Sequence, residues 1–380
     1  MRIITAFFAS GSLLIAPNAV ARTDYESAAR IAYMVDMTSD TVLFDKNSRR
    51  KIPPASMAKM MTTYVAFELI AEGKLSPAQK FKVRPETWKA WNNIGSTMFL
   101  KPGEEVRVAD LLHGVVTLSG NDAAIVLAEG IAGDEEAFVA QMNAAAKGLG
   151  MKDSHFGTAT GWSDNGRTVT TARDLALLGM RTIRDFPALY RQYYGHPKFR
   201  WNNITQPNRN PILGKIAGAD GVKTGHTNEA GFCFTGTAEQ NGRRVMMVVA
   251  GHASTDERSA ESVRFMQWGF DAWQARALFK AGKVVTYVPV QLGTKSRIAV
   301  LAPRNLALVL PAVDAPRYKL SVRYHGPIKA PFKKGDEVAQ LVAKFSDGTQ
   351  QIMPLIAAQS VAGAGFFGRA WNGLKSLVDA

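Results

Sequence analysis

Cysteine is almost absent from this sequence of 380 residues, which contains only Cys233. A single cysteine excludes an internal disulfide bond, but it does not by itself identify the compartment in which the chain works. No cluster of His, Asp, Glu and Cys has the spacing of a metal site, and no glycine-rich phosphate-binding loop occurs. We therefore expect neither a metal ion nor an organic cofactor.

Acidic residues are scarce relative to basic ones. The chain has 46 Lys and Arg against 32 Asp and Glu, which gives a formal net charge of +14. Such a charge can indicate binding to nucleic acid, but no zinc-finger spacing, RNA-recognition pattern or basic heptad array accompanies it. The partners that remain for a basic chain are an anionic membrane surface and an anionic polymer.

The apolar run at the N-terminus, residues 3–15, is shorter than the ~20 residues that a membrane-spanning helix needs. It follows the basic Arg2 and precedes Ala19-Val20-Ala21, an Ala-x-Ala cleavage site. This is the arrangement of a secretory signal peptide, which we assign to residues 1–21. The alternative, an uncleaved membrane anchor, is disfavoured by the short apolar core. We expect the protein to be exported.

The order of predicted elements over residues 24–280 indicates an α/β (α+β) domain. Alternating runs around a turn at 38–40 predict a first hairpin, a mostly helical stretch follows, and strands return around Asn241-Gly242, a strong hairpin signal. A helix is predicted over 260–278. Two strands, a helical insert, three strands and a helix favour a central antiparallel sheet with helices on its faces and a separate helical lobe.

The residue pattern of the sequence changes at about residue 283. Short alternating runs between turn residues predict a small β-sandwich over 283–357. Beyond Gly363, apolar residues including Phe367 and Trp371 fall on one helical stripe, with charged and polar residues on the other. This segment is too short to span a bilayer, so we assign 361–380 to an amphipathic helix lying on a membrane surface. The alternative is a helix packed against the β-rich domain.

Ser56 and Lys59 form a Ser-x-x-Lys motif after two prolines, in a stretch that predicts the start of a helix. Three residues are just under one helical turn, so Lys59 lies over Ser56 on the same face. A neutral amine there can take the proton of the serine hydroxyl and make it a nucleophile. A lysine becomes neutral near pH 7 only in a buried, cationic environment. Taken alone, the motif also fits a helix-capping serine beside a surface lysine.

Two later motifs favour the catalytic interpretation. Ser119-Gly120-Asn121 falls between two predicted helices, where glycine permits an unusual backbone conformation. Lys223-Thr224-Gly225 precedes the predicted hairpin strands, and His226 follows it. A nearly identical trio characterises β-lactamases and penicillin-binding proteins. Ser119 could instead be a plain cap of the helix that follows it.

With these motifs, the chain resembles the low-molecular-mass penicillin-binding proteins, which are serine D-alanyl-D-alanine carboxypeptidases of the Ser-x-x-Lys type. The resemblance covers the signal, the catalytic domain (24–280), the β-rich domain (283–357) and the terminal helix (361–380). It implies peptidoglycan stem peptides as substrates, β-lactam antibiotics as inhibitors, and a location at the periplasmic face of the bacterial cytoplasmic membrane. The β-rich domain would hold the catalytic domain away from the membrane.

The resemblance also implies roles for single residues. Ser56 is the nucleophile, Lys59 its base, and Ser119 a proton relay to the leaving amine. The other five motif residues would bind substrate: the side chain of Asn121 the peptide amide, Lys223 and Thr224 the terminal carboxylate, Gly225 the peptide backbone along the strand edge, and the His226 backbone N–H, with that of Ser56, the oxyanion.

Two rival functions share part of this pattern. A serine β-lactamase has the same trio, but its class A form needs a glutamate to activate the deacylating water, and Glu135, Glu136 and Glu229 lie in other apparent contexts. A non-catalytic wall-binding protein would not need all three motifs intact. We expect His113 and His155 to be structural, and Cys233 to pack as a small apolar side chain.

Overall fold

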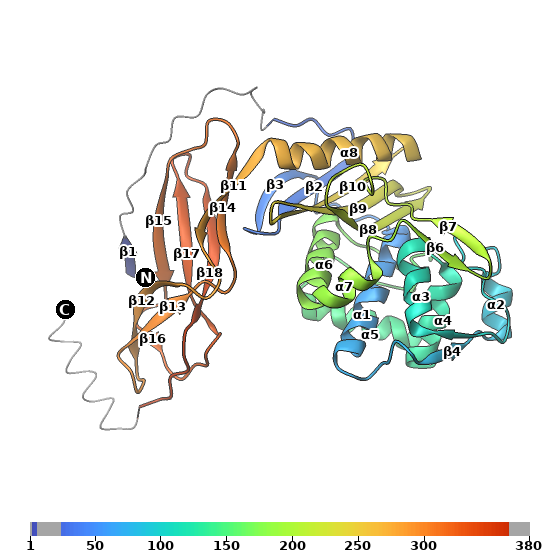
Figure 1. The fold of residues 1–380 in the computed structure, drawn as a ribbon, viewed down its shortest axis with the longest axis horizontal. Helices are drawn as coiled ribbons and strands as arrows, with labels where there is room; N and C mark the ends of the chain where they lie inside the picture. The colour runs from blue at the N-terminus through green and yellow to red at the C-terminus, as the bar shows by residue number, and fades with distance from the viewer. Residues whose placement is uncertain (1, 6–23, 365–380) are drawn as a thin grey trace. The chain divides into compact units, whose positions relative to one another are not determined.

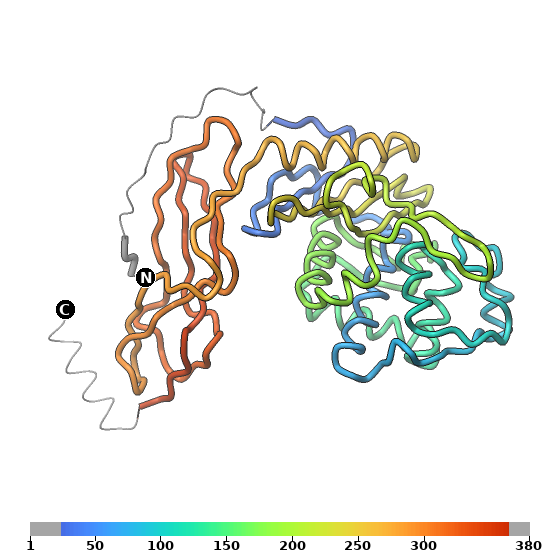
Figure 2. Tube along the Cα trace, in the orientation of Figure 1, coloured from blue at the N-terminus to red at the C-terminus, as the bar shows by residue number. Residues whose placement is uncertain are grey.

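The structure is a computed structural model that describes residues 2–5 and 24–364. The chain divides into two compact units, visible in the ribbon of Figure 1 and the trace of Figure 2. The larger unit comprises residues 25–37 and 42–270, and the smaller unit takes most of its described residues from 271 onward.

A five-stranded sheet forms the centre of the larger unit, with its strands in the order β3-β2-β10-β9-β8. β10 runs antiparallel to β2 and β9, and β8 runs antiparallel to β9, so the predicted central antiparallel sheet is confirmed. β8 lies at the edge of this sheet. The strands are β2 (Ile31–Asp36), β3 (Thr41–Lys46), β8 (Ala219–Thr227), β9 (Gly231–Gln240) and β10 (Arg243–His252).

Helices cover both faces of this sheet (Figure 1). On one face, α8 (Thr255–Asp271) brings Gly269 against Met34 of β2. On the other, α6 (Ala172–Asp185) brings Gly179 against Met246 of β10. Since both faces are covered, β2 is buried at every position and shows no alternation of polar and apolar residues.

The helical lobe follows the predicted order, and its helix ends have clear local causes. α5 begins after Asp134, whose carboxylate accepts from the backbone N–H of Ala137, and ends at Gly150 in the left-handed conformation. Thr171 caps α6 in the same way. The lobe contains α1 (Lys59–Ala71), α2 (Pro85–Trp91), α3 (Val108–His113), α4 (Asn121–Ala132), α5 (Glu135–Leu149) and α7 (Pro187–Tyr193), with two short strands, β4 (Lys80–Lys82) and β5 (Glu105–Arg107).

Two details differ from the sequence analysis. A hairpin for which the sequence analysis predicts no element lies within the stretch expected to be mostly helical. It consists of β6 (Lys198–Trp201) and β7 (Ile204–Pro207), and two asparagines at its tip adopt positive φ. The helix predicted over 260–278 is wrong at its C-terminal end. It stops at Asp271, and the strand β11 (Trp273–Phe279) follows, since its pairing with β14 outweighs the local helical pattern.

The smaller unit is β-rich, as predicted. A seven-stranded sheet has the order β1-β15-β17-β18-β13-β12-β16, and β11 pairs with β14 in a second sheet. Side chains of both sheets share one apolar core, to which Leu308 of β14 and Val300 of β13 belong. The strands are β1 (Arg2–Thr5), β12 (Val284–Gln291), β13 (Arg297–Leu301), β14 (Leu306–Pro311), β15 (Tyr318–Tyr324), β16 (Ile328–Lys329), β17 (Glu337–Phe345) and β18 (Gln350–Ala357).

The two terminal segments lie mostly outside the described residues. Of the predicted signal, only residues 2–5 are described, as β1, and the cleavage site is not. Of the predicted terminal helix, only 361–364 are described. These four residues are extended and join the β-rich unit, where Val361 pairs with Phe332 and Gly363 with Gly293. No helix among the described residues is long and apolar enough to cross a membrane.

Candidate active site

Ser56 lies in a single 3-10 turn, η1 (Ala55–Ala58), which leads directly into α1. The N-cap of α1 is Ala58, so Ser56 is not its capping residue. Ala55 has a positive φ of 50°, a conformation that a residue with a Cβ adopts rarely and only where its surroundings impose it. The turn therefore presents Ser56 at the start of a helix, as the motif predicts, but through a strained backbone.

Lys59 lies at the first position of α1 with its side chain fully buried. Its Nζ donates to three oxygens: Ser56 Oγ at 3.1 Å, Asn121 Oδ1 at 2.7 Å and the backbone oxygen of Thr160 at 2.8 Å. Burial, together with the charge of Arg209, lowers the pKa of Lys59 to about 7, while Asp122 acts in the opposite direction. A large fraction of the amine is thus neutral at pH 7, within hydrogen-bonding distance of the serine hydroxyl.

Ser119 and Asn121 lie where the π-helical turn η2 (Gly114–Leu118) gives way to α4. Ser119 is buried and has a left-handed backbone, with φ of 63°. Asn121 is held on both sides: its Oδ1 accepts from Lys59, and its Nδ2 donates to the backbone oxygen of Ile94 at 3.0 Å. The middle motif therefore contacts the Ser-x-x-Lys motif directly, through the bond between Asn121 and Lys59.

Lys223, Thr224 and Gly225 lie on the edge strand β8, and the first two side chains are buried. Burial lowers the pKa of Lys223 well below its ordinary value, and the charges of Lys59, Arg209 and Arg258 lower it further. The two lysines thus repel each other across the site.

His226, the next residue along β8, is exposed, and its ring stacks on that of Phe232, with the two centroids 3.9 Å apart. As the residue after Gly225, His226 has its backbone next to the three motif residues.

Two glycines allow backbone segments to approach the Ser56 turn closely. A Cβ on Gly161 would lie 1.9 Å from the backbone oxygen of Ala55, and one on Gly225 would lie 2.7 Å from that of Pro54. Gly161 also has a φ of +69°. A Cβ on Gly225 would thus point at the Ser56 turn. This glycine therefore has a packing role in addition to the one expected at the strand edge.

Two arginines at the site were not singled out by the sequence analysis. Arg209, between β7 and β8, donates to Ser96 Oγ and acts on both lysines. Arg258 is buried in the first turn of α8, above the ring of Phe232, and among the described residues its Nε has no hydrogen-bond partner. Neither belongs to a motif, and no spacing along the chain could have identified them.

The other polar candidates have structural surroundings. His113 packs against the rings of Tyr193 and Phe199, and burial lowers its pKa to about 4. His155 bonds to a backbone oxygen through Nδ1. Cys233 is buried, and burial raises the pKa of its thiol to about 11. The described residues contain no group of three or more His, Cys, Asp or Glu that could hold a metal ion.

Comparison with known proteins agrees with this geometry. The sequence profile of the D-alanyl-D-alanine carboxypeptidase family matches residues 17–254, and that of the C-terminal domain of penicillin-binding protein 5 matches 273–362. The chain is 35% identical to D-alanyl-D-alanine carboxypeptidase DacC of Escherichia coli (strain K12) over 368 residues, which cover 94% of this chain and 92% of that protein.

Solved structures show the same likeness. Penicillin-binding protein 5 of Haemophilus influenzae superposes with a TM-score of 0.79 at 31% identity, covering 89% of this chain and 99% of that one. Ampicillin-bound penicillin-binding protein D2 of Listeria monocytogenes gives a TM-score of 0.58 at 30% identity, covering 65% and 99%.

The fold and these matches first define a class, the serine peptidases that bind penicillin. Within that class, the chain belongs to the D-alanyl-D-alanine carboxypeptidase family. It is thus a hydrolase with carboxypeptidase activity, as the motifs predicted.

The pKa of Lys59 leads to a prediction about pH. With Lys59 as the base that we expect for Ser56, acylation needs the neutral amine, so its rate should rise with pH through about 7 and level off above. A lysine with an ordinary pKa would place the same rise near ~10.4. The measurement is the rate constant for adduct formation with a fluorescent penicillin at a series of pH values. A rise centred above pH ~9 would contradict the assignment of Lys59 as the base.

The contact between Gly161 and Ala55 gives a second prediction. Gly161→Ala should slow acylation by at least about tenfold, because the new methyl group must displace the Ser56 turn or the chain around Thr160. Gly166→Ala is a matched control, since Gly166 also has a positive φ but a Cβ there meets no atom within 4 Å. Equal acylation rates in the two variants would show that this close approach does not position the site.

Proposed function

We propose that the protein removes the terminal D-alanine from the pentapeptide stems of peptidoglycan through an acyl-enzyme on Ser56. The observation that carries the proposal is the buried amine of Lys59, 3.1 Å from Ser56 Oγ and with a pKa of about 7. A serine hydroxyl becomes a nucleophile when a positioned base takes its proton, and no histidine or carboxylate donates to or accepts from this hydroxyl among the described contacts.

The reaction would proceed in two steps. Neutral Lys59 takes the proton of Ser56 Oγ, which attacks the carbonyl carbon between the two D-alanines. Backbone N–H groups of Ser56 and His226 stabilise the oxyanion. Ser119 passes a proton to the leaving amine as the C–N bond breaks, and free D-alanine departs. Water then attacks the ester carbonyl, and its proton passes through Lys59 to Ser56 Oγ as the ester C–O bond breaks, which frees Ser56 and releases the shortened stem.

The terminal carboxylate of the substrate would meet a cluster of cations. Lys223 and Thr224 on β8 provide an ammonium and a hydroxyl, and Arg209 and Arg258 contribute charges that do not depend on pH near neutrality. Lys223 is driven toward its neutral form when no anion is bound. A carboxylate in contact with it favours the ammonium, so substrate binding would restore the charge of Lys223.

The role of Asn121 is divided between the enzyme and its substrate. One lone pair of its Oδ1 accepts from Lys59, and one hydrogen of its Nδ2 goes to Ile94. An amide side chain has a second lone pair and a second hydrogen. We infer that these remaining positions bind the substrate amide, while the existing bonds hold Lys59 in place.

β-Lactam antibiotics would acylate the same serine, since their strained amide takes the place of the substrate's amide bond. A β-lactamase would also need a group that activates water for rapid deacylation. Glu135 is engaged with the backbone N–H of Ala159, at 2.8 Å, and Glu229 is exposed in the turn between β8 and β9. The family match also favours the carboxypeptidase over the β-lactamase and over a non-catalytic wall-binding protein.

The location of the enzyme is part of the same proposal. A signal peptide over residues 1–21 would export it, and an amphipathic segment at the C-terminus would hold it at the outer face of the cytoplasmic membrane. What supports this is the sequence pattern of both segments and the net charge of +14, which favours an anionic surface.

Two variants test the catalytic roles. Ser56→Ala removes the nucleophile and should abolish both D-alanine release and the penicillin adduct. Lys59→Arg keeps a charge at this position but provides a group that cannot give up its proton, so it should reduce acylation by about a thousandfold or more. Release of D-alanine is followed with a pentapeptide, and the adduct by intact-mass analysis with peptide mapping. Unchanged D-alanine release in Ser56→Ala would disprove the acyl-enzyme, and a rapid adduct in Lys59→Arg would disprove the base.

A truncation tests the membrane proposal. Deletion of residues 365–380 should leave an active enzyme that no longer sediments with vesicles containing anionic phospholipid. The deletion begins at 365 because 361–364 hydrogen-bond to the β-rich unit, where the N–H of Ala364 donates to Leu292. Full retention on the vesicles would show that another part of the chain binds the membrane.

A further inference from the structure

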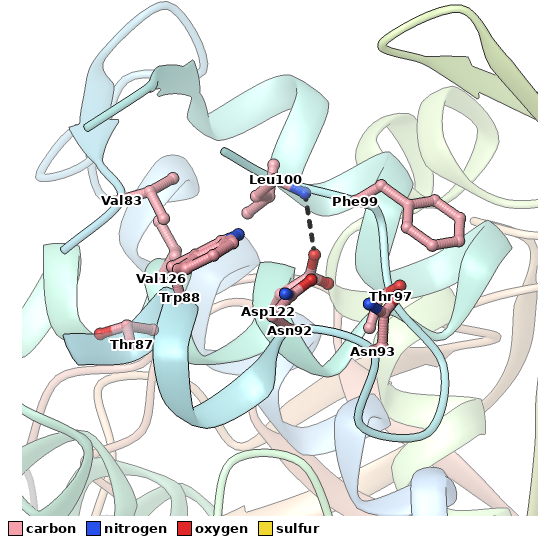
Figure 3. A pocket seen from close by; sticks show the side chains of 10 residues that line it. All are labelled: Val83, Thr87, Trp88, Asn92, Asn93, Thr97, Phe99, Leu100, Asp122 and Val126. Atoms are coloured by element: carbon pink, nitrogen blue, oxygen red, sulfur yellow. Dashed lines mark hydrogen bonds between the residues drawn. The ribbon is translucent and has the colours of Figure 1, made fainter. Parts of the chain in front are cut away.

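Asp122, next to Asn121 in α4, is a buried carboxylate without a cationic hydrogen-bond partner among the described contacts. Its oxygens accept instead from three backbone N–H groups: Met98 at 2.8 Å, Leu100 at 3.2 Å and Ala123 at 2.8 Å. Burial raises the pKa of Asp122, and the three N–H groups oppose this. Figure 3 shows the carboxylate at the wall of a small pocket, with a dashed line from it to the backbone of Leu100.

The chain that Asp122 holds, residues 94–100, also holds the catalytic groups. The backbone oxygen of Ile94 accepts from Asn121 Nδ2, and that of Ser96 accepts from the N–H of Asn121 at 2.7 Å. The hydroxyl of Ser96 accepts from Arg209. Both the direct partner of Lys59 and the arginine that lowers its pKa are thus attached to a segment that Asp122 fixes.

We propose that Asp122 is a positioning residue of the acylation reaction, which fixes residues 94–100 so that this segment holds Asn121 and Arg209 against Lys59. The inference rests on the proposed role of Lys59 as the base. An isolated structural carboxylate would stabilise the fold without influencing the base. Here the backbone N–H groups bonded to Asp122 fix the segment that contacts Asn121 and Arg209, and the negative charge of Asp122 acts on the amine of Lys59.

The charges that act on Lys59 have opposite signs. Arg209 disfavours its protonated form, and Asp122 favours it. Loss of the charge at Asp122 should therefore shift the pH dependence of acylation to lower pH, and a weaker hold on Arg209 should shift it to higher pH. A carboxylate that did not hold the segment would give the first shift alone, without a fall in the acylation rate.

The first test is Asp122→Asn in the full-length protein, which removes the charge and turns an NH₂ group toward backbone N–H donors. The acylation rate of the folded enzyme with a fluorescent penicillin should fall at least about tenfold at its optimum, because charge-assisted bonds to the segment are lost. Loss of the negative charge alone would move the increase of the rate to lower pH by up to about one unit, and a looser hold on Arg209 would offset part of this shift, so the fall in rate is the readout of positioning.

The second variant, Ser96→Ala, keeps Asp122 and removes only the hydroxyl that accepts from Arg209. Ser96 is half-buried, so this variant should fold even if Asp122→Asn does not. Without this bond the guanidinium of Arg209 is held less closely, so the pKa of Lys59 should increase toward its ordinary value. The increase of the acylation rate should then occur at higher pH. Thermal unfolding of each variant measures the fraction of folded protein, and rates are expressed per folded molecule.

The outcomes separate this inference from the proposed function. If the acylation rate of the wild-type enzyme does not increase near pH 7, the assignment of Lys59 as the base fails, and the proposed function and this inference both depend on it. A wild-type rise near pH 7, with rates and pH profiles unchanged in both variants, would overturn the positioning role of Asp122 alone. A fall in the rate per folded molecule of Asp122→Asn, together with the upward shift in Ser96→Ala, supports the proposal. The full downward shift in Asp122→Asn with an unchanged rate, or no shift in Ser96→Ala, overturns it.

Discussion

The site depends on the burial of one amine without a carboxylate bonded to it. The three partners of Lys59 are a hydroxyl, an amide oxygen and a backbone oxygen, which accept its hydrogens but do not balance a positive charge. A carboxylate bonded to this lysine would keep it protonated, and the serine would have no base. Desolvation and the charge of Arg209 thus favour the neutral amine, while the carboxylate of Asp122 limits the effect.

Several elements contribute to this environment, and each approaches the Ser56 turn closely. β8 can lie against the turn because Gly225 has no side chain, and the chain at Gly161 approaches from another direction for the same reason. Ala55 and Ser119 both have left-handed backbones beside the catalytic groups. Strain at these positions is maintained by the surrounding core, since the buried apolar side chains of α1 and α4 hold the elements in place.

The cations around the proposed site have a consequence for specificity. A carboxylate entering it raises the pKa of nearby lysines, which helps Lys223 to bind it but acts against the neutral form of Lys59. Permanently charged arginines offset that second effect, because Arg209 acts on Lys59 directly. Under the proposed mechanism, a substrate with a terminal carboxylate would be attracted to these cations while Lys59 stays available as the base. With lysines alone, a bound carboxylate would favour the protonated form of Lys59, and the site would lose its proposed base.

Local patterns in the sequence determined the turn at Ser56, the hairpin at Asn241-Gly242 and the short strands of the β-rich unit, because each depends on residues close together in the chain. The central antiparallel sheet was expected from the order of its elements, although β10 pairs with β2 from the other end of the domain. The end of α8 could not be predicted, since the pairing of β11 with β14 outweighs local helix propensity. Arg209, Arg258 and the anchor formed by Asp122 were also beyond the reach of sequence patterns. A charge alters a pKa through space, and only the tertiary fold decided which distant charges lie near Lys59.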